Sequence, residues 1–525
     1  MEKRGEINHA VFWPSLLVVL GLSVPLAIWP EQGGRAVNAV WSFITDHFGW
    51  FFLLFGFFCF AVLIWLALGR YGNVKLGGPD EEPEFSTFSW IAMLFAAGIG
   101  GGIMMWCIME PIFYLNGPPF GVKPGSPLAF EWAHLYGMFH WGFSAWAIYC
   151  IPTIPIAYAV FVRKEPTLRF STALRPIFGK LVDGWVGVII DVLICFGLVG
   201  AVGTSLGLEV PAVSAMLNGL FGLQDSIWLQ LVIVVIWLCI FGTSVYRGLS
   251  KGIKVLSDIN LYLAFVLIAF VLLAGPTVFI LKMTVNSLGL LLNNFFRMTF
   301  WMDPIAKSGF PEAWTVFYWA WWIAYAPMMG LFVARISKGR TIKELVIAEC
   351  FWGTLGCWLY MAIFGGYSLF LEANHIVPLT QIMNESGQFA VIVATVKSLP
   401  LSKIAMFVWT VLIFIFLATT VDSTAYTLAS VCTRRLRGDE QPARWHRVIW
   451  AIALASVSIG LLVVGGLQPV QLSSIIAALP LTPVLILLII SGIKMLKEDF
   501  PHLQPKKEAI DYRPAVSYQQ QSVDA

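Results

Sequence analysis

Residues 89–115 read SWIAMLFAAGIGGGIMMWCIMEPIFYL, an apolar run that is long enough to cross a lipid bilayer as one helix. Four glycines, Gly98, Gly100, Gly101 and Gly102, stand within five residues at its centre. Glycine weakens a helix, so this stretch predicts a break that leaves backbone carbonyls unpaired in mid-membrane. Such carbonyls are tolerated where they line a cavity or meet a ligand. Close helix packing through the Gly98–Gly102 pair is the alternative.

The rest of the chain repeats this apolar character. Of its 525 residues 58% are hydrophobic and 12% are charged, whereas a soluble protein carries about 25% charged residues. Apolar runs of about 18–25 residues alternate with short charged clusters, as membrane-spanning helices require. The sequence therefore predicts an all-α integral membrane protein with twelve spans, at 12–29, 48–69, 89–115, 133–161, 183–209, 226–245, 257–281, 312–335, 344–371, 402–432, 447–466 and 470–493.

The charges predict the orientation of these spans. Twelve spans place both termini on one side, and Lys and Arg concentrate on the cytoplasmic side of membrane proteins. Only seven of the 33 Lys and Arg residues fall on the side away from the termini, namely Arg35, Lys123, Lys282, Arg297, Lys307, Lys397 and Lys403. Both termini are therefore expected in the cytoplasm. The net charge of +3 is spread along the chain, which gives no footprint for a nucleic acid.

Two segments are not predicted to span the membrane. Residues 284–302 mix Leu and Phe with Asn293, Asn294 and Arg297, a pattern that favours a helix lying along the outer membrane surface. The tail after Lys497 is polar and is expected to be disordered. The eight cysteines lie in or beside apolar runs without a CxxC pair, which indicates neither a disulfide framework nor a zinc site.

Aromatic residues stand deep in the span at 312–335. Trp321 and Trp322 lie about 14 Å below the start of the helix, near the bilayer midplane, where the aromatic belt of the membrane interface does not explain them. Tyr325 follows one turn later, so the three rings can form one wall. Pro327 is expected to break the helix just beyond.

The span at 133–161 places Trp141, Trp146 and Tyr149 at a similar depth. Together the two sets of rings predict an aromatic cage, which suits a quaternary ammonium ion because such an ion donates no hydrogen bond and is attracted to ring faces. Each desolvated ring contributes about 0.5–2 kcal/mol, so three or four rings are needed to offset the loss of hydration. Plain filling of the core is the alternative for these side chains.

The span at 402–432 contains Thr419, Thr420, Asp422 and Ser423 at depth. Oxygens of this kind suit a hard cation such as Na⁺, although Ser and Thr can also bond back to their own helix. The acidic residues nearer to span ends are interpreted as structural, namely Glu110, Asp191, Glu209 and Asp258. No HExxH, P-loop, GxSxG or Cys/His motif is present, so nothing in the sequence supports an enzyme.

The stretches AAGIGGG, FHWGFSAW, MDPIAKSGFPEAWTVFYWAWW and ARISKGRT, spread over twelve spans, resemble the betaine/choline/carnitine transporter family. The resemblance implies a carrier of the bacterial inner membrane with two inverted five-helix repeats of the LeuT type. It also implies a trimer in which the surface helix is a contact element. The units expected are two extra N-terminal spans, the first repeat, the surface helix and loop, the second repeat and the tail, at 1–88, 89–282, 283–311, 312–496 and 497–525.

The same resemblance assigns roles to individual residues. It implies a substrate wall made of Trp141, Trp146, Tyr149, Trp321, Trp322, Tyr325, Met329, Gly100 and Gly102. It implies that one sodium site uses Ala96, Ile99, Phe416, Thr419 and Thr420, while a second finds only apolar Leu198 and Val202 and is missing.

The substrate wall carries details that separate branches of that family. At the positions of Tyr325 and Met329 this chain resembles the carnitine/γ-butyrobetaine antiporter, which also has Tyr and Met there. That antiporter has an Arg where this chain has Lys254. Choline carriers have Asp at the position of Gly102, so a glycine there favours a zwitterion.

The sequence thus predicts a secondary transporter of a trimethylammonium zwitterion, L-carnitine or a related betaine, coupled to one Na⁺ and without other cofactors. Sodium-independent exchange of carnitine for γ-butyrobetaine and osmotic uptake of glycine betaine are the alternatives within transport. A channel or a membrane receptor for quaternary amines is the alternative of another class.

Overall fold

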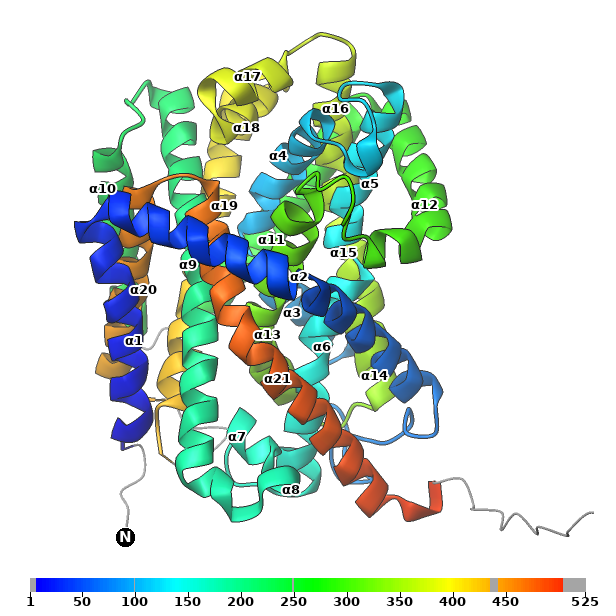
Figure 1. The fold of residues 1–525 in the computed structure, drawn as a ribbon, viewed down its shortest axis with the longest axis vertical. Helices are drawn as coiled ribbons and strands as arrows, with labels where there is room; N and C mark the ends of the chain where they lie inside the picture. Colours follow the sequence, from blue (N-terminus) through cyan, green and yellow to red (C-terminus); the bar gives the residue numbers. More distant parts are fainter. Residues whose placement is uncertain (1–5, 99, 248–249, 435–441, 504–525) are drawn as a thin grey trace, which may run out of the picture.

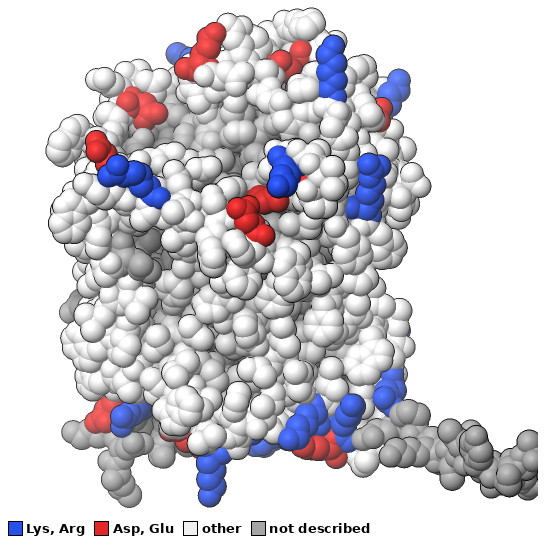
Figure 2. Space-filling model, viewed as in Figure 1, with Lys and Arg blue, Asp and Glu red and all other residues white. Residues whose placement is uncertain are grey.

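The computed structural model describes residues 6–98, 100–247, 250–434 and 442–503. Apart from two isolated β-bridges, the regular elements in these ranges are all helices (Figure 1). Among the described residues, ten helical segments are long and apolar enough to cross a membrane, and some of them join two or more of the helices named below. On the face shown in Figure 2, the charged residues lie toward the two ends of the molecule and leave a broad uncharged band between them. The predicted all-α membrane fold is therefore confirmed.

The helices alternate between long spanning elements and short connecting ones. Wider, π-helical turns extend or join several of them, over Tyr158–Val162, Pro311–Val316, Ile347–Gly353 and Met361–Gly365. In chain order the α-helices are α1 (His9–Ile28), α2 (Pro30–Leu68), α3 (Thr87–Gly98), α4 (Gly102–Asn116), α5 (Pro127–His140), α6 (Phe143–Ala157), α7 (Phe170–Ala173), α8 (Arg175–Phe178), α9 (Trp185–Phe221), α10 (Ile227–Arg247), α11 (Ser250–Ala274), α12 (Thr277–Phe300), α13 (Phe317–Ile336), α14 (Ile342–Val346), α15 (Thr354–Tyr360), α16 (Gly366–Ala373), α17 (Leu379–Ser386), α18 (Gln388–Lys397), α19 (Ser402–Val431), α20 (Arg444–Val464) and α21 (Leu467–Asp499).

Three of the twelve predicted spans are not among the ten long helices. The span at 89–115 is split into α3 and α4 at the glycines, as expected. The spans at 226–245 and 257–281 correspond to α10 and α11, of which the fully described parts are the apolar stretches Ile227–Ile240 and Ile259–Ala274. The second of these ends early because Gly275 and Pro276 stop α11, so the residues that follow belong to α12. By length and composition α12 could itself cross a membrane, and its position along the membrane surface stays a prediction.

A second break, which was not predicted, divides the span at 133–161. Helix α5 ends at His140 and α6 begins at Phe143, with Trp141 and Gly142 between them. A methyl group built on Gly142 would lie 2.7 Å from the carbonyl oxygen of Met138, so only glycine fits this bend. Indole N–H groups satisfy two carbonyls at the end of α5: Trp358 donates to Met138 at 2.7 Å and Trp322 donates to His140 at 3.0 Å.

The break that was expected at Pro327 is absent. Helix α13 runs without interruption from Phe317 to Ile336, with Pro327 inside it. Proline is tolerated within membrane-buried helices where the surrounding packing holds the backbone. Residues on both sides of Pro327 are buried against other helices, which gives α13 that support.

Helix α13 lies at the centre of the molecule. In the most apolar part of the span Pro311–Ile336, which contains α13, 94% of the residues are buried, against 17% in the corresponding part of α12 at the edge. It packs against α6, α9 and α21, and α21 crosses in front of it in Figure 1. The first turn of α1 and the last turn of α21 lie at the same lower end of the view, beside α7 and α8 (Figure 1). The described beginning and end of the chain therefore share one side.

At that end, the loop between α2 and α3 is bound to the loop between α13 and α14. Backbone hydrogen bonds join Leu76 and Arg340 at 2.8 Å and Ile342 and Val74 at 3.0 Å. The Arg340 guanidinium donates to the Phe85 carbonyl at 2.7 Å and lies 4.5 Å from the centre of the Trp90 ring. These contacts hold the start of α3, and with it the glycine break, against the end of α13.

Replacing Arg340 with alanine is expected to destabilise the protein by roughly 2–3 kcal/mol, because a buried, charge-assisted hydrogen bond and a cation–π contact are lost together. Thermal unfolding of the detergent-purified protein would measure the change. Arg335→Ala is the control, since the exposed Arg335 donates one hydrogen bond to Tyr426 at 3.2 Å. Equal melting of both variants would contradict a clamping role for Arg340.

Candidate functional site

A small cavity lies where the two helix breaks face α9, α13 and α19. It unites seven of the predicted substrate residues, from three separate parts of the chain. Its walls are Gly98, Gly100, Gly102, Trp141, Tyr149, Ser205, Trp321, Trp322, Tyr325, Met328 and Thr420. Five of these eleven residues are aromatic, and none carries a formal charge. The cavity therefore offers ring faces and backbone and hydroxyl groups to a ligand.

Two of the rings stand nearly at right angles to Trp322, and a third is nearly parallel to it. Trp141 meets Trp322 with a centroid separation of 4.9 Å and an interplanar angle of 83°, and Tyr149 meets it at 5.2 Å and 87°. Trp321 lies beside Trp322 at 5.8 Å with an angle of 24°. Perpendicular walls of this kind present faces from several directions, which is the arrangement that attracts a cation.

The polar hydrogens of these rings are already used within the protein. Trp322 donates to the His140 carbonyl at 3.0 Å, and Trp321 donates to the Ala201 carbonyl at 3.3 Å. The Trp141 indole donates to Glu110 at 3.1 Å. The three indoles are thus fixed in place and present only their π-systems to the cavity. A ligand that needs no hydrogen bond around its cationic centre is the chemical match.

The glycine break allows close approach to these rings. A methyl group built on Gly102 would lie 2.9 Å from a Trp321 ring carbon, and one built on Gly98 would lie 2.4 Å from the ring of Trp146. Larger residues would therefore fill the cavity or displace the rings. The break at this point supports both alternatives that the sequence left open, because the glycines pack closely and also line a cavity.

Glu110 is part of the site's support, although its sequence position suggested only a structural pair. It is fully buried on α4 and accepts hydrogen bonds from Tyr114, from Trp141 at 3.1 Å and from Tyr318 at 2.8 Å. His140 lies 3.2 Å from the same carboxylate. The network positions Trp141 at the helix break. Its one signal in the sequence is Tyr114, which stands one helical turn after Glu110.

Comparison with known proteins decides what kind of protein contains this cavity. A model described as "BCCT, betaine/carnitine/choline family transporter" matches residues 10–501. The chain belongs to this transporter family. The transporter is also similar to a solved structure of a Na⁺-coupled sialic acid symporter in a substrate-bound outward-open state. That match has 13% sequence identity and a TM-score of 0.44, and covers 86% of this chain and 84% of the other.

Two predicted substrate residues lie outside the cavity lining of the transporter. Trp146 packs between Gly98 of α3 and Gly353, so that its ring is enclosed by backbone. Met329 of α13 is fully buried outside the cavity lining, and its neighbour Met328 lines the cavity in its place. Met328 is held by Thr424, whose hydroxyl donates to the Met328 sulfur at 3.3 Å.

The predicted sodium ligands of the transporter are only partly placed. Thr420 lines the cavity, and a methyl group on Gly100 would lie 3.4 Å from its hydroxyl. Thr419 donates to the Phe416 carbonyl at 2.8 Å, the back-bonded alternative for such hydroxyls. Ile99 lies outside the described residues, and for Ala96 only the backbone is described. The hydroxyl and carbonyl oxygens that are described fit the chemistry of a sodium site.

The acidic residue of α19, Asp422, forms an ion pair instead of a sodium site. Asp422 accepts a hydrogen bond from Arg447 of α20 at 3.0 Å, in a pair that is largely buried. A buried carboxylate that is paired with a cationic side chain is a structural ion pair, and we do not count it among the sodium ligands. Lys254, the counterpart of the antiporter's arginine, has a side chain outside the described part of the structure.

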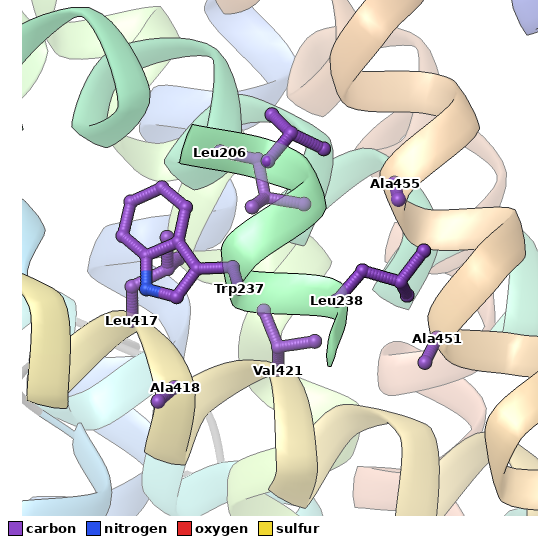
Figure 3. Close-up of a pocket in the computed structure, with 9 residues that line it drawn as sticks. Leu206, Trp237, Leu238, Leu417, Ala418, Val421, Ala451 and Ala455 are labelled. Carbon is purple, nitrogen blue, oxygen red and sulfur yellow. The ribbon is translucent and has the colours of Figure 1, made fainter. Parts of the chain in front are cut away.

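A second small cavity lies between α9, α10, α19 and α20 (Figure 3). Trp237 and Leu238 meet Leu417, Val421 and small alanines there. The walls are almost wholly apolar, and the one ring present offers no cage. This cavity therefore suits hydrocarbon and gives no basis for recognising a charged substrate.

Proposed function

We propose that this transporter carries L-carnitine or a closely related betaine across the bacterial inner membrane by alternating access, with both termini in the cytoplasm. The observation that carries the proposal is that the indole N–H groups of the cage are already hydrogen-bonded within the protein. Trp141, Trp321 and Trp322 all donate their N–H groups to the protein, so the rings meet the substrate as faces. A trimethylammonium group is the ligand that such faces select, because it is a permanent cation without a proton to donate.

The charge balance of the cavity favours a zwitterion. Its lining residues carry no formal charge, so they cannot neutralise a substrate with a net charge. A substrate that has its own carboxylate is neutral overall and avoids the cost of burying a net charge. The Tyr325 hydroxyl, which pairs with Ser205 at 2.7 Å, lies in the wall with Thr420 and offers polar contacts for the carboxylate end. Tyr325 is also the residue whose identity resembles the carnitine branch.

Coupling to one sodium ion is proposed on the position of Thr420. Its hydroxyl lies close to the glycine break, and a helix broken inside a membrane protein can offer backbone carbonyls to a hard cation. Sodium bound there would hold α19 against the break between α3 and α4. The ion would thereby favour the arrangement of helices that closes the cage, which is how a coupled ion adds to substrate affinity.

A competition panel in proteoliposomes tests both proposals together. Carnitine, γ-butyrobetaine, glycine betaine and choline compete for labelled carnitine, with external Na⁺ or with K⁺ in its place. We expect carnitine to compete best and K⁺ to lower uptake at least about tenfold, a loss of roughly 1.4 kcal/mol in coupling. Thr420→Ala should raise the sodium concentration needed for half-maximal uptake. Thr427→Ala is the control, because Thr427 donates back to Ser423 on the same helix at 2.8 Å.

Each outcome of the panel has one meaning. Uptake that is indifferent to sodium but needs γ-butyrobetaine inside the vesicles would replace symport by exchange. Preference for glycine betaine would indicate an osmolyte carrier. Equilibration without accumulation against a gradient would indicate a channel and would contradict secondary transport.

A trimer with α12 as its contact element is proposed as the assembly. This helix lies at the edge of the molecule (Figure 1) and exposes large apolar side chains, among them Leu292 at 85% and Phe296 at 64%. His134 of α5 holds the other face of α12 through Ser287 at 2.7 Å. The exposed face is thereby presented in a fixed orientation to neighbouring subunits or to lipid.

A further inference from the structure

Next to the cavity, the carboxylate of Glu209 on α9 is buried without a hydrogen-bond partner among the described residues. The residue is fully buried, and both of its carboxylate oxygens lack a hydrogen-bond partner within the described structure. An ionised carboxylate is very costly in a dry environment without a partner, whereas the neutral acid is tolerated. A buried acid in this condition is a site where a proton is held until another positive charge replaces it.

Glu209 lies directly behind the cavity wall. A methyl group built on Gly101 would be 2.5 Å and 3.1 Å from its two carboxylate oxygens. The residues on either side of that glycine, Gly100 and Gly102, both line the cavity. One residue of backbone therefore separates the carboxylate from the space between the rings. Two charges on either side of a single buried residue interact strongly, because the protein interior screens them less than water does.

The groups that face Glu209 do not neutralise it. From the break between α3 and α4 it meets the backbone of Gly101, and from α13 the Tyr325 phenol is close enough to interact with it electrostatically. That phenol is hydrogen-bonded to Ser205, one turn before Glu209 on α9. No Lys, Arg or His forms a salt bridge with it among the described residues. Glu110, the acid on α4, is occupied by its own donors, and Asp422 on α19 is paired with Arg447.

We propose that Glu209 is a proton-binding site that exchanges its proton for the charge of a quaternary ammonium substrate, which makes substrate selectivity depend on pH. This inference rests on the proposed function, because it assumes that a quaternary amine occupies the ring cage. A net cation in the cage favours ionised Glu209, and the released proton passes to water. A zwitterion offsets this effect with its own carboxylate and is bound with Glu209 protonated.

The direction of the pH effect follows from this exchange. Raising the pH removes the proton from Glu209 more readily, so the affinity for a net cation such as choline should increase. The affinity for the zwitterion glycine betaine should change much less. The ratio of the two dissociation constants therefore reports on Glu209 and cancels general effects of pH on the protein.

The experiment measures choline and glycine betaine binding to the purified, full-length protein by tryptophan fluorescence, from about pH 5.5 to about pH 8.5 at constant sodium. The choline-to-glycine betaine ratio of dissociation constants should fall by about tenfold over this range, the change that one unit of coupled titration produces. In Glu209→Gln the ratio should be constant at its acidic value. Glu349→Gln is the matched control, because Glu349 is also a fully buried acid, beside Cys150, and is not part of the cavity wall. This variant should keep the wild-type pH dependence.

The outcomes separate this inference from the proposed function. If neither ligand binds at any pH, the aromatic cage is not a quaternary amine site and the proposed function fails. If both bind but the wild-type ratio is independent of pH, or if Glu209→Gln keeps the dependence, the proton site is overturned. A ratio that changes with sodium at fixed pH would overturn it as well, in favour of sodium at Glu209. The wild-type measurement decides the matter even if Glu209→Gln fails to fold.

Discussion

Replacing Trp322 with alanine is expected to lower the affinity for carnitine by roughly 100-fold and to abolish transport at working concentrations. The change removes the ring that Trp141 and Tyr149 both face, at 4.9 Å and 5.2 Å. A desolvated ring contributes about 2 kcal/mol to cation binding, and the loss of its alignment with Trp141 and Tyr149 adds to this. Uptake of labelled carnitine into proteoliposomes, with protein yield measured in parallel, would test the prediction.

Trp358→Ala provides the control for this prediction. Trp358 also donates its indole N–H to the end of α5, at 2.7 Å from the Met138 carbonyl, but it is absent from the cavity wall. Both variants leave one helix-end carbonyl without its partner, at a cost of about 1–3 kcal/mol in stability. Only the change at Trp322 should remove binding. Retention of carnitine uptake by Trp322→Ala would contradict the aromatic cage itself.

Replacing Gly102 with valine is expected to close the cavity. Even a single methyl group at this position would lie 2.9 Å from Trp321 and 3.8 Å from Trp141, so a branched side chain must push the rings aside or occupy the space of the substrate. We expect carnitine binding to fall beyond detection, while the protein still reaches the membrane. Titration of tryptophan fluorescence with carnitine would measure the loss.

The control for the glycine variant is Gly289→Val on α12, where nothing lies within 4 Å of an added methyl group. Both variants place a β-branched residue in a helical region, so they share its modest cost in helix propensity. If Gly102→Val binds carnitine as Gly289→Val does, the glycine break is a packing device and does not border the substrate.

The broad fold could be predicted because the length and apolarity of each span can be seen directly in its own sequence. The break at 99–101 was also visible, since clustered glycines act on their own helix. The break at Gly142 was not, because one glycine in a long apolar run has many uses, and this bend depends on Trp322 and Trp358 from distant segments. Pro327 shows the reverse case, in which a local helix breaker is overruled by the packing around it.

The site was predictable where depth alone selects residues. Trp141, Tyr149, Trp321, Trp322 and Tyr325 all line the cavity. Trp146 was expected beside Trp141 on one continuous helix, and the bend between α5 and α6 changes the relation between them. The roles of the buried acids could not be predicted either, because the donors to Glu110 and the glycine that meets Glu209 come from other helices.

The indole of Trp322 closes the end of α5 as well as one side of the cage, and this double duty constrains how the protein can evolve. A substitution there changes the scaffold and the ligand preference at once, so selection has little freedom at that position. Tyr325 and Met328 are held by side-chain partners, Ser205 and Thr424, which can change together with them. Divergence toward new quaternary amines is therefore expected to proceed through paired replacements at these two positions, around a tryptophan that stays the same.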